Sequence, residues 1–140
     1  MVTETNNTER DIGYSASFTT KVTEKMVNQF AELSGDFNPI HVDAEYAAKS
    51  RFKQRIAHGM IVGALISRAL VDGIGRHGIY LSQSMKFVNP VFLDDDVTVT
   101  VTITAIRKER GLATVETIAK KGNGDIVVKG EAMIMMAKPA

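Results

Sequence analysis

The residue types best suited to chemistry lie in one short segment, Asp36-Phe37-Asn38-Pro39-Ile40-His41. It places a carboxylate and an imidazole five positions apart, on a stretch where Pro39 restricts φ and bends the chain. The two side chains could converge on one water molecule, one taking a proton while the other gives one up. Asn38 could orient a partner or cap the turn. Asp, Asn and Pro are also common turn formers, so the segment alone leaves an ordinary turn as an alternative.

A second segment, Ile56-Ala57-His58-Gly59, opens a strongly apolar stretch. Gly59 is expected at a helix N-terminus, where free N–H groups and the positive end of the helix dipole favour a developing negative charge. A thioester carbonyl held there would be polarised toward an enolate, which opens its β-carbon to attack by water. The alternative is that Gly59 only lets the helix pack closely. We expect His58 to form a structural hydrogen bond rather than act as a third catalytic group.

The elements that hold these two segments follow from the hydrophobic pattern. Residues 15–22 have β character and predict a short strand. Thr23 can cap a following helix whose apolar residues recur at helical spacing, and Gly35 can end that helix in a left-handed turn. Asp43 can cap a second, short helix over residues 44–48. The Asp-His segment is therefore expected to be a loop that directly follows an ordered helix, a common place for function.

Residues 60–71 are apolar on nearly every helical face and predict a buried central helix, too short to span a bilayer. A β pattern follows, with a hairpin signal at Lys120-Lys121-Gly122-Asn123-Gly124-Asp125. The later strands are expected at residues 79–88, 97–104, 112–119 and 126–137. We therefore predict an α+β fold in which a bent antiparallel sheet is wrapped around the central helix. A single domain over residues 1–140 is expected, with about the first ten residues disordered.

Composition narrows the classes of partner. The chain has 140 residues, 44% of them hydrophobic, and a net charge of +1, which favours one globular domain and gives no reason to expect nucleic acid or a membrane as partner. The absence of cysteine excludes disulfides and thiolate metal sites. No signal-peptide pattern opens the chain, so we expect a cytoplasmic protein. Asp36, His41 and Asp43 could form a metal site by ligand type, but nothing calls for one, and no metal is predicted.

Three segments of the sequence together resemble a known family. Ser34 to Asp43, Tyr46-Ala47, and Arg55-Ile56-Ala57-His58-Gly59-Met60 together are similar to the (R)-specific enoyl-CoA hydratases of the MaoC-like group. The resemblance extends over about residues 17–137. It implies a hot-dog fold, in which a bent antiparallel sheet encloses a central helix, in agreement with the pattern above.

The resemblance also implies roles for single residues. Asp36 and His41 would activate water for syn addition, and the Gly59 N–H would hold the thioester oxygen. Ser67 matches a serine near the active site, although its hydroxyl could equally bond back to the preceding helical turn. Leu70 would limit the acyl length or belong only to the core.

Assembly and cofactors follow from the same resemblance. It implies a homodimer with the acyl-CoA tunnel near the subunit interface, and neither a metal nor an organic cofactor. The alternating basic residues of 49–55 could meet the phosphates of CoA or form a solvated loop.

The predicted activity is that of a hydro-lyase. It converts trans-2-enoyl-CoA and water reversibly to (R)-3-hydroxyacyl-CoA, for fatty-acid oxidation or the supply of polyhydroxyalkanoate precursors. One alternative is the same chemistry on acyl-carrier-protein (ACP) substrates, in a 3-hydroxyacyl-ACP dehydratase. Others are an acyl-CoA thioesterase and a non-catalytic acyl-CoA-binding domain. The sequence leaves open which of Asp36 and His41 is the base, since a coupled pair can share the proton.

Overall fold

A computed structural model of the chain describes residues 3–4 and 10–136. Its elements are β1 (Thr3–Glu4), β2 (Ser15–Lys21), α1 (Glu24–Ser34), α2 (Pro39–Val42), α3 (Ala44–Ala48), α4 (Gly59–Ala69), the π-helix η1 (Leu70–Ile74), β3 (Ile79–Phe87), β4 (Asp96–Arg107), β5 (Leu112–Lys121) and β6 (Ile126–Met135). Among these residues no helix is long and apolar enough to cross a membrane.

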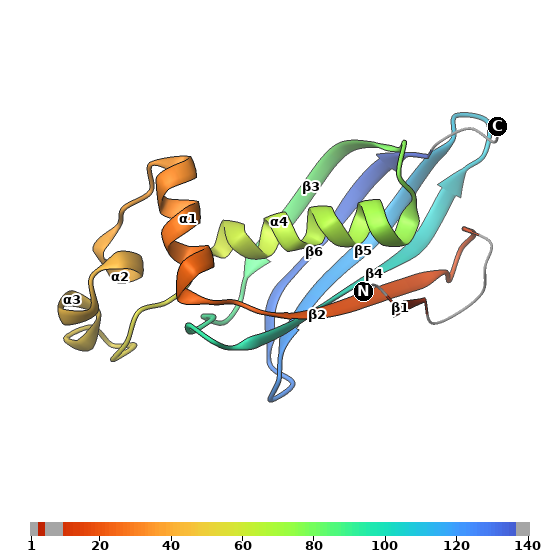
Figure 1. Cartoon of the computed structure of the whole chain (residues 1–140). Helices are drawn as coiled ribbons and strands as arrows, with labels where there is room; N and C mark the ends of the chain where they lie inside the picture. Colours follow the sequence, from red (N-terminus) through yellow and green to blue (C-terminus); the bar gives the residue numbers. More distant parts are fainter. Residues whose placement is uncertain (1–2, 5–9, 137–140) are drawn as a thin grey trace.

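The strands form one antiparallel sheet in the order β1-β2-β4-β5-β6-β3. Every second side chain of a strand points to the inner face of the sheet. The alternation is most regular in β4, where Val97, Val99, Val101 and Ile103 are buried. Helix α4 lies along the inner side of the bent sheet, with α1, α2 and α3 at one end of the molecule (Figure 1). The predicted arrangement of a bent antiparallel sheet around a central helix is confirmed.

The central helix buries its apolar face in the core but leaves one stripe uncovered. Ile61, Val62, Leu65, Ile66 and Ala69 are buried, as expected for this helix. The sequence did not predict that a second stripe stays exposed in the single chain. It consists of Met60 (51% exposed), Ala64 and Arg68 on α4 and Val71 on η1. The stripe recurs every three or four residues, so it lies along one side of the helix.

The predicted helix caps are present. The Thr23 hydroxyl accepts a hydrogen bond from the Met26 N–H at 3.2 Å, and the Asp43 carboxylate accepts one from the Tyr46 N–H at 3.1 Å. Gly35 adopts φ +79°, and its N–H bonds the Ala31 carbonyl at 2.8 Å. The prediction of a plain loop after Gly35 is wrong. Residues 39–42 form the short helix α2, for which proline at the first helical position is well suited.

Several element ends differ from the predicted ones. β4 runs on to Arg107 past a register shift between Ile103 and Ala105, where the regular alternation ends. The central helix continues as a π-helix to Ile74. Of the first ten residues, expected to be disordered, 3–4 form β1, while 1–2 and 5–9 lie outside the described residues. The predicted end of the last strand at 137 also lies outside them.

Candidate active site

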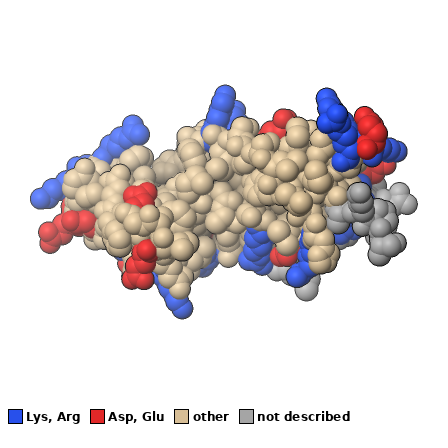
Figure 2. Space-filling view, turned by 90° about the horizontal axis from the view of Figure 1, so that it is seen from above, with Lys and Arg blue, Asp and Glu red and all other residues tan. Residues whose placement is uncertain are grey.

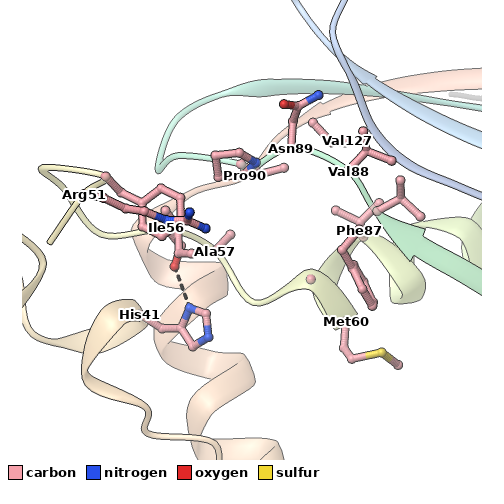
Figure 3. A pocket seen from close by; sticks show the side chains of 15 residues that line it. His41, Arg51, Ile56, Ala57, Met60, Phe87, Val88, Asn89, Pro90 and Val127 are labelled. Carbon is pink, nitrogen blue, oxygen red and sulfur yellow. Dashed lines mark hydrogen bonds between the residues drawn. The ribbon is translucent and has the colours of Figure 1, made fainter.

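A pocket of about 400 Å³ opens beside the N-terminus of α4 (Figure 3). Apart from His41 and Arg51, no residue of its lining is titratable. His41, Ile56 and Arg51 lie on one side of it, and Met60 and Phe87 on the other. The remaining lining residues are Phe52, Ala57, Gly59, Val62, Val88, Asn89, Pro90, Val91, Val127 and Val128. The combination of apolar walls and few polar groups is typical of a small-molecule site.

The imidazole of His41 is held by the main chain of the segment before α4. Its Nδ1 lies 2.8 Å from the carbonyl oxygen of Ile56 (Figure 3). A carbonyl can only accept, so Nδ1 carries the proton and donates it. In the neutral ring Nε2 is therefore the unprotonated nitrogen, which can accept a proton from a reactant. The ring is half-buried, so Nε2 can act on a reactant in the pocket that His41 lines.

Asp36 is brought next to this imidazole by the turn between α1 and α2. Asp36, His41 and His58 each offer one side-chain atom within 4.8 Å of the others. The Asp36 carboxylate is exposed, and its Oδ1 accepts the Asn38 N–H at 3.2 Å. The Ser34 hydroxyl in turn accepts the Asp36 N–H at 3.1 Å. The structure thus places an exposed carboxylate and an imidazole where one water molecule can contact both.

Gly59 is the first residue of α4 and lines the pocket. The first N–H groups of an α-helix have no intrahelical acceptor, so they are available to a ligand oxygen. A Cβ at position 59 would lie 2.5 Å from two ring carbons of Phe87. The glycine therefore also allows the close packing that the sequence left as an alternative. The two roles do not compete, because one uses the main-chain N–H and the other the missing side chain.

Arg55 ties the parts of the site together, which the sequence did not indicate. Its Nε donates to the His41 carbonyl at 2.6 Å, and its two terminal nitrogens donate to Glu24 at 2.7 Å and Asn28 at 2.9 Å on α1. These contacts join α1 to α2. They also occupy the guanidinium, so of the basic stretch it is Arg51, not Arg55, whose side chain lines the pocket.

Asp36, which lies beside His41, is not itself a lining residue of the pocket, and the other three residues singled out from the sequence also lie outside the lining. Ser67 is half-buried on α4, two turns beyond Gly59. Leu70 is 4% exposed and belongs to the hydrophobic core. Asn38 is exposed and precedes α2 without a side-chain capping bond, while its carbonyl accepts the His41 N–H at 2.9 Å. Their expected roles toward substrate remain predictions.

Fold and site together define a family, and comparison with known proteins identifies it. Residues 5–123 match the family model described as MaoC-like domain, and the chain belongs to this family. It is similar to the (R)-specific enoyl-CoA hydratase of Aeromonas caviae, with 38% identity over 90% of this chain and 95% of the relative. The enzyme of the same name from Rhodospirillum rubrum is 42% identical over 89% of this chain and 86% of the relative.

A solved structure shows the same fold. The unliganded R-hydratase PhaJ1 from Pseudomonas aeruginosa superposes with a TM-score of 0.88 at 40% identity, over 92% of this chain and 83% of that chain. The hot-dog fold expected from the sequence is thereby confirmed.

Proposed function

We propose that the protein is an (R)-specific enoyl-CoA hydratase, a hydro-lyase that adds water reversibly to trans-2-enoyl-CoA to give (R)-3-hydroxyacyl-CoA. The observation that carries the proposal is the meeting of His41, beside Asp36, and the N-terminus of α4 at one largely apolar pocket. Relatives 38% and 42% identical over about nine tenths of the chain carry this name.

The geometry supports a reaction in two proton transfers. In the proposed reaction, a water molecule binds between the Asp36 carboxylate and the imidazole of His41, whose side-chain atoms lie within 4.8 Å of each other. Nε2 of His41 takes one proton from this water while the water oxygen forms a bond to the β-carbon. The electron pair of the double bond moves to the thioester oxygen, where the Gly59 N–H stabilises the enolate. The imidazolium then returns the proton to the α-carbon. Since water and proton arrive from the same side of the substrate, the addition is syn.

The direct test is to follow the loss of the enoyl-thioester absorbance of crotonyl-CoA and to determine the configuration of the product. We expect hydration with formation of (R)-3-hydroxybutyryl-CoA. An (S) product would contradict the proposal. Release of free CoA thiol would identify a thioesterase instead, and binding without turnover would identify an acyl-CoA-binding domain. Much faster turnover of the ACP-bound substrate would favour the dehydratase of fatty-acid synthesis.

We further propose that Arg51 contacts a phosphate of CoA. It is the sole permanently charged residue of the pocket lining, and its guanidinium lies 4.7 Å from the Phe52 ring centroid. Replacing Arg51 by Ala is expected to raise KM for crotonyl-CoA about fivefold with kcat little changed, because a partly solvated ion pair contributes roughly 1 kcal/mol. KM for the N-acetylcysteamine thioester, which lacks phosphates, is expected to stay unchanged.

The matched control is Lys49→Ala, which removes one charge from the same basic stretch at an exposed position outside the pocket lining. It should leave both KM values as in the wild type. An equal rise for the two thioesters in the Arg51 variant would contradict a phosphate contact.

We also propose that the enzyme is a homodimer joined through β3. This strand ends the described sheet, and Ile79, Tyr80 and Leu81 expose apolar surface on it, while Lys86 is its sole charged residue. Figure 2, seen from the side on which β3 lies, shows a broad surface with few charges between charged ends. The Tyr80 hydroxyl is uncharged at neutral pH, and partial burial raises its pKa further. Long apolar edges of this kind pair with another strand unless they are protected.

The exposed stripe of α4 continues this surface. The methionine side chain of Met85 on β3 lies against Gly63 of α4, and Phe87 lies against Gly59. β3 and the uncovered side of α4 therefore form one largely apolar surface, with Arg68 and Lys86 as its charged residues, that a two-fold-related copy can cover. A second copy also explains why an apolar helix has a bare side in the single chain.

Replacing Leu81 by Glu is expected to convert the dimer to a monomer, because two charges would face each other across the two-fold axis. Leu81 is 46% exposed, so the substitution adds little strain within one chain. The measurement is the mass in solution by light scattering, with Ile12→Glu, at an apolar position 60% exposed but off β3, as the control. A wild type of one-chain mass, or a Leu81 variant that stays dimeric, would contradict the interface.

A further inference from the structure

His58 is a buried histidine that the hydration steps above do not use. It is 2% exposed and precedes α4 at the N-cap position, yet its side chain makes no capping bond. Its ring lies between two others. The centroid of Phe30 on α1 is 4.8 Å away at 50°, and that of His41 is 4.1 Å away at 29°, a stacked arrangement. The ring is thus directed toward the Asp-His segment rather than toward its own helix.

Among the described residues the His58 ring has one hydrogen bond, and it goes to Asp36, the other member of the Asp-His pair. His58 Nε2 lies 2.9 Å from the main-chain carbonyl oxygen of Asp36. Because the carbonyl can only accept, Nε2 carries the proton, and Nδ1 holds the lone pair of the neutral ring. Nδ1 is buried without a hydrogen-bond partner in the described part of the chain. In the described part of the chain, the hydrogen bonding of the ring is therefore directed to the main chain of Asp36.

The stack on His41 supplies a restraint that the hydrogen bond to Ile56 cannot. The contact between His41 Nδ1 and the Ile56 carbonyl fixes one point in the plane of the imidazole. It leaves the ring free to tilt about that contact, which would swing Nε2 away from the water. A second ring stacked at 4.1 Å on its face blocks the tilt. Two restraints at different points thereby determine where Nε2 is aimed.

We infer that His58 is a positioning residue of this hydratase, which holds Asp36 by its main chain and His41 by its ring face. The inference rests on the proposed function. One side chain, 22 and 17 positions away along the sequence, restrains both groups that hold the water. Misplacement of reacting groups by about 1 Å can lower a rate by as much as 10²-fold. Loss of His58 is therefore expected to lower kcat rather than substrate binding.

Two near-isosteric variants separate the two restraints. His58→Phe keeps a ring to stack on His41 and removes the donor to Asp36. His58→Gln keeps an amide N–H near the position of Nε2 and removes the ring. For each we expect kcat to fall about tenfold with KM within about twofold, and for His58→Ala we expect a fall of roughly 10²-fold. Higher kcat in both single-restraint variants than in His58→Ala is the rescue that a positioning role predicts.

A variant that is less stable can also lose activity, so the measurements must separate misplacement of His41 and Asp36 from loss of folded protein. All rates are compared at a temperature well below the melting temperature of each variant, and the His41 ring signals are followed by NMR. We expect the His41 Nδ1–H signal to remain sharp in His58→Phe and to broaden in His58→Gln. Wild-type kcat in His58→Phe and His58→Gln, or a raised KM with unchanged kcat, would overturn the inference, even where His58→Ala does not fold. A wild type inactive on enoyl-CoA would overturn the proposed function, while the NMR comparison would still test the restraint on His41.

Discussion

Replacing His41 by glutamine is expected to lower kcat for crotonyl-CoA hydration by about 10³-fold, since general acid–base groups contribute roughly 10² to 10⁴. The glutamine amide has no basic nitrogen comparable to Nε2, the atom left unprotonated by the bond to Ile56. Its amide nitrogen takes the place of Nε2 rather than Nδ1, so the hydrogen bond to the Ile56 carbonyl is lost as well, and the melting temperature of the variant is the control for folding. KM is expected to change little, because the apolar lining of the pocket remains.

Asp36→Asn tests the partner of His41 with a group of the same shape. We expect a fall of about 10²-fold in kcat, because the amide orients a water molecule less well than a carboxylate. The double variant should lose little more than the more impaired single variant, since residues that act on one water act as a unit. Melting temperatures near that of the wild type serve as the control for folding. Activity within tenfold of the wild type in either single variant would contradict the mechanism.

Replacing Gly130 by alanine is expected to lower the free energy of unfolding by about 3 kcal/mol. Gly130 lies on β6 and pairs with Met85 of β3. A Cβ there would lie far inside the contact distance of the main-chain oxygen of Ser84 on β3. Because the clash is with main chain rather than with a flexible side chain, β3 would have to move away from β6. Glycine inside a strand marks such a close approach.

The measurement is thermal unfolding, where a loss of about 3 kcal/mol lowers the melting temperature by roughly 10 °C for a domain of this size. Gly122→Ala is the matched control, because a Cβ at that hairpin glycine meets nothing within 4 Å. The control is expected to melt within about 2 °C of the wild type. If the Gly130→Ala and Gly122→Ala variants had the same melting temperature, the close contact between Gly130 and the main chain of β3 would not be required for stability.

The elements that could be predicted from the sequence are those whose signals are local. Thr23 and Gly35 mark the ends of α1, and both make the capping contacts that their residue types suggest. The period-two pattern predicted a strand over residues 97–104, and the structure has β4 there with alternate residues buried. The strand was nevertheless predicted too short, because the register shift after Ile103 interrupts the alternation while pairing with β5 continues. The sequence likewise gave no sign of α2 within the Asp-His segment.

The same division holds for the site. Asp36 and His41 could be paired from the sequence because they are five positions apart and belong to one turn. The hydrogen bonds from Arg55 to Glu24 and Asn28 on α1 join residues 31 and 27 positions apart, and the hydrogen bond from His58 to Asp36 joins residues 22 positions apart. No local sequence pattern reveals such contacts.

The sequence by itself determined the chemical groups, the capping residues of α1 and α3 and the alternation of the strands, because backbone propensities and caps depend on neighbours within one or two turns. Only the tertiary structure decided which groups meet at the pocket, which nitrogen of His41 is free, and which side of α4 stays uncovered. Those outcomes depend on packing between segments that are distant in the chain, where many pairings compete and no local pattern selects among them.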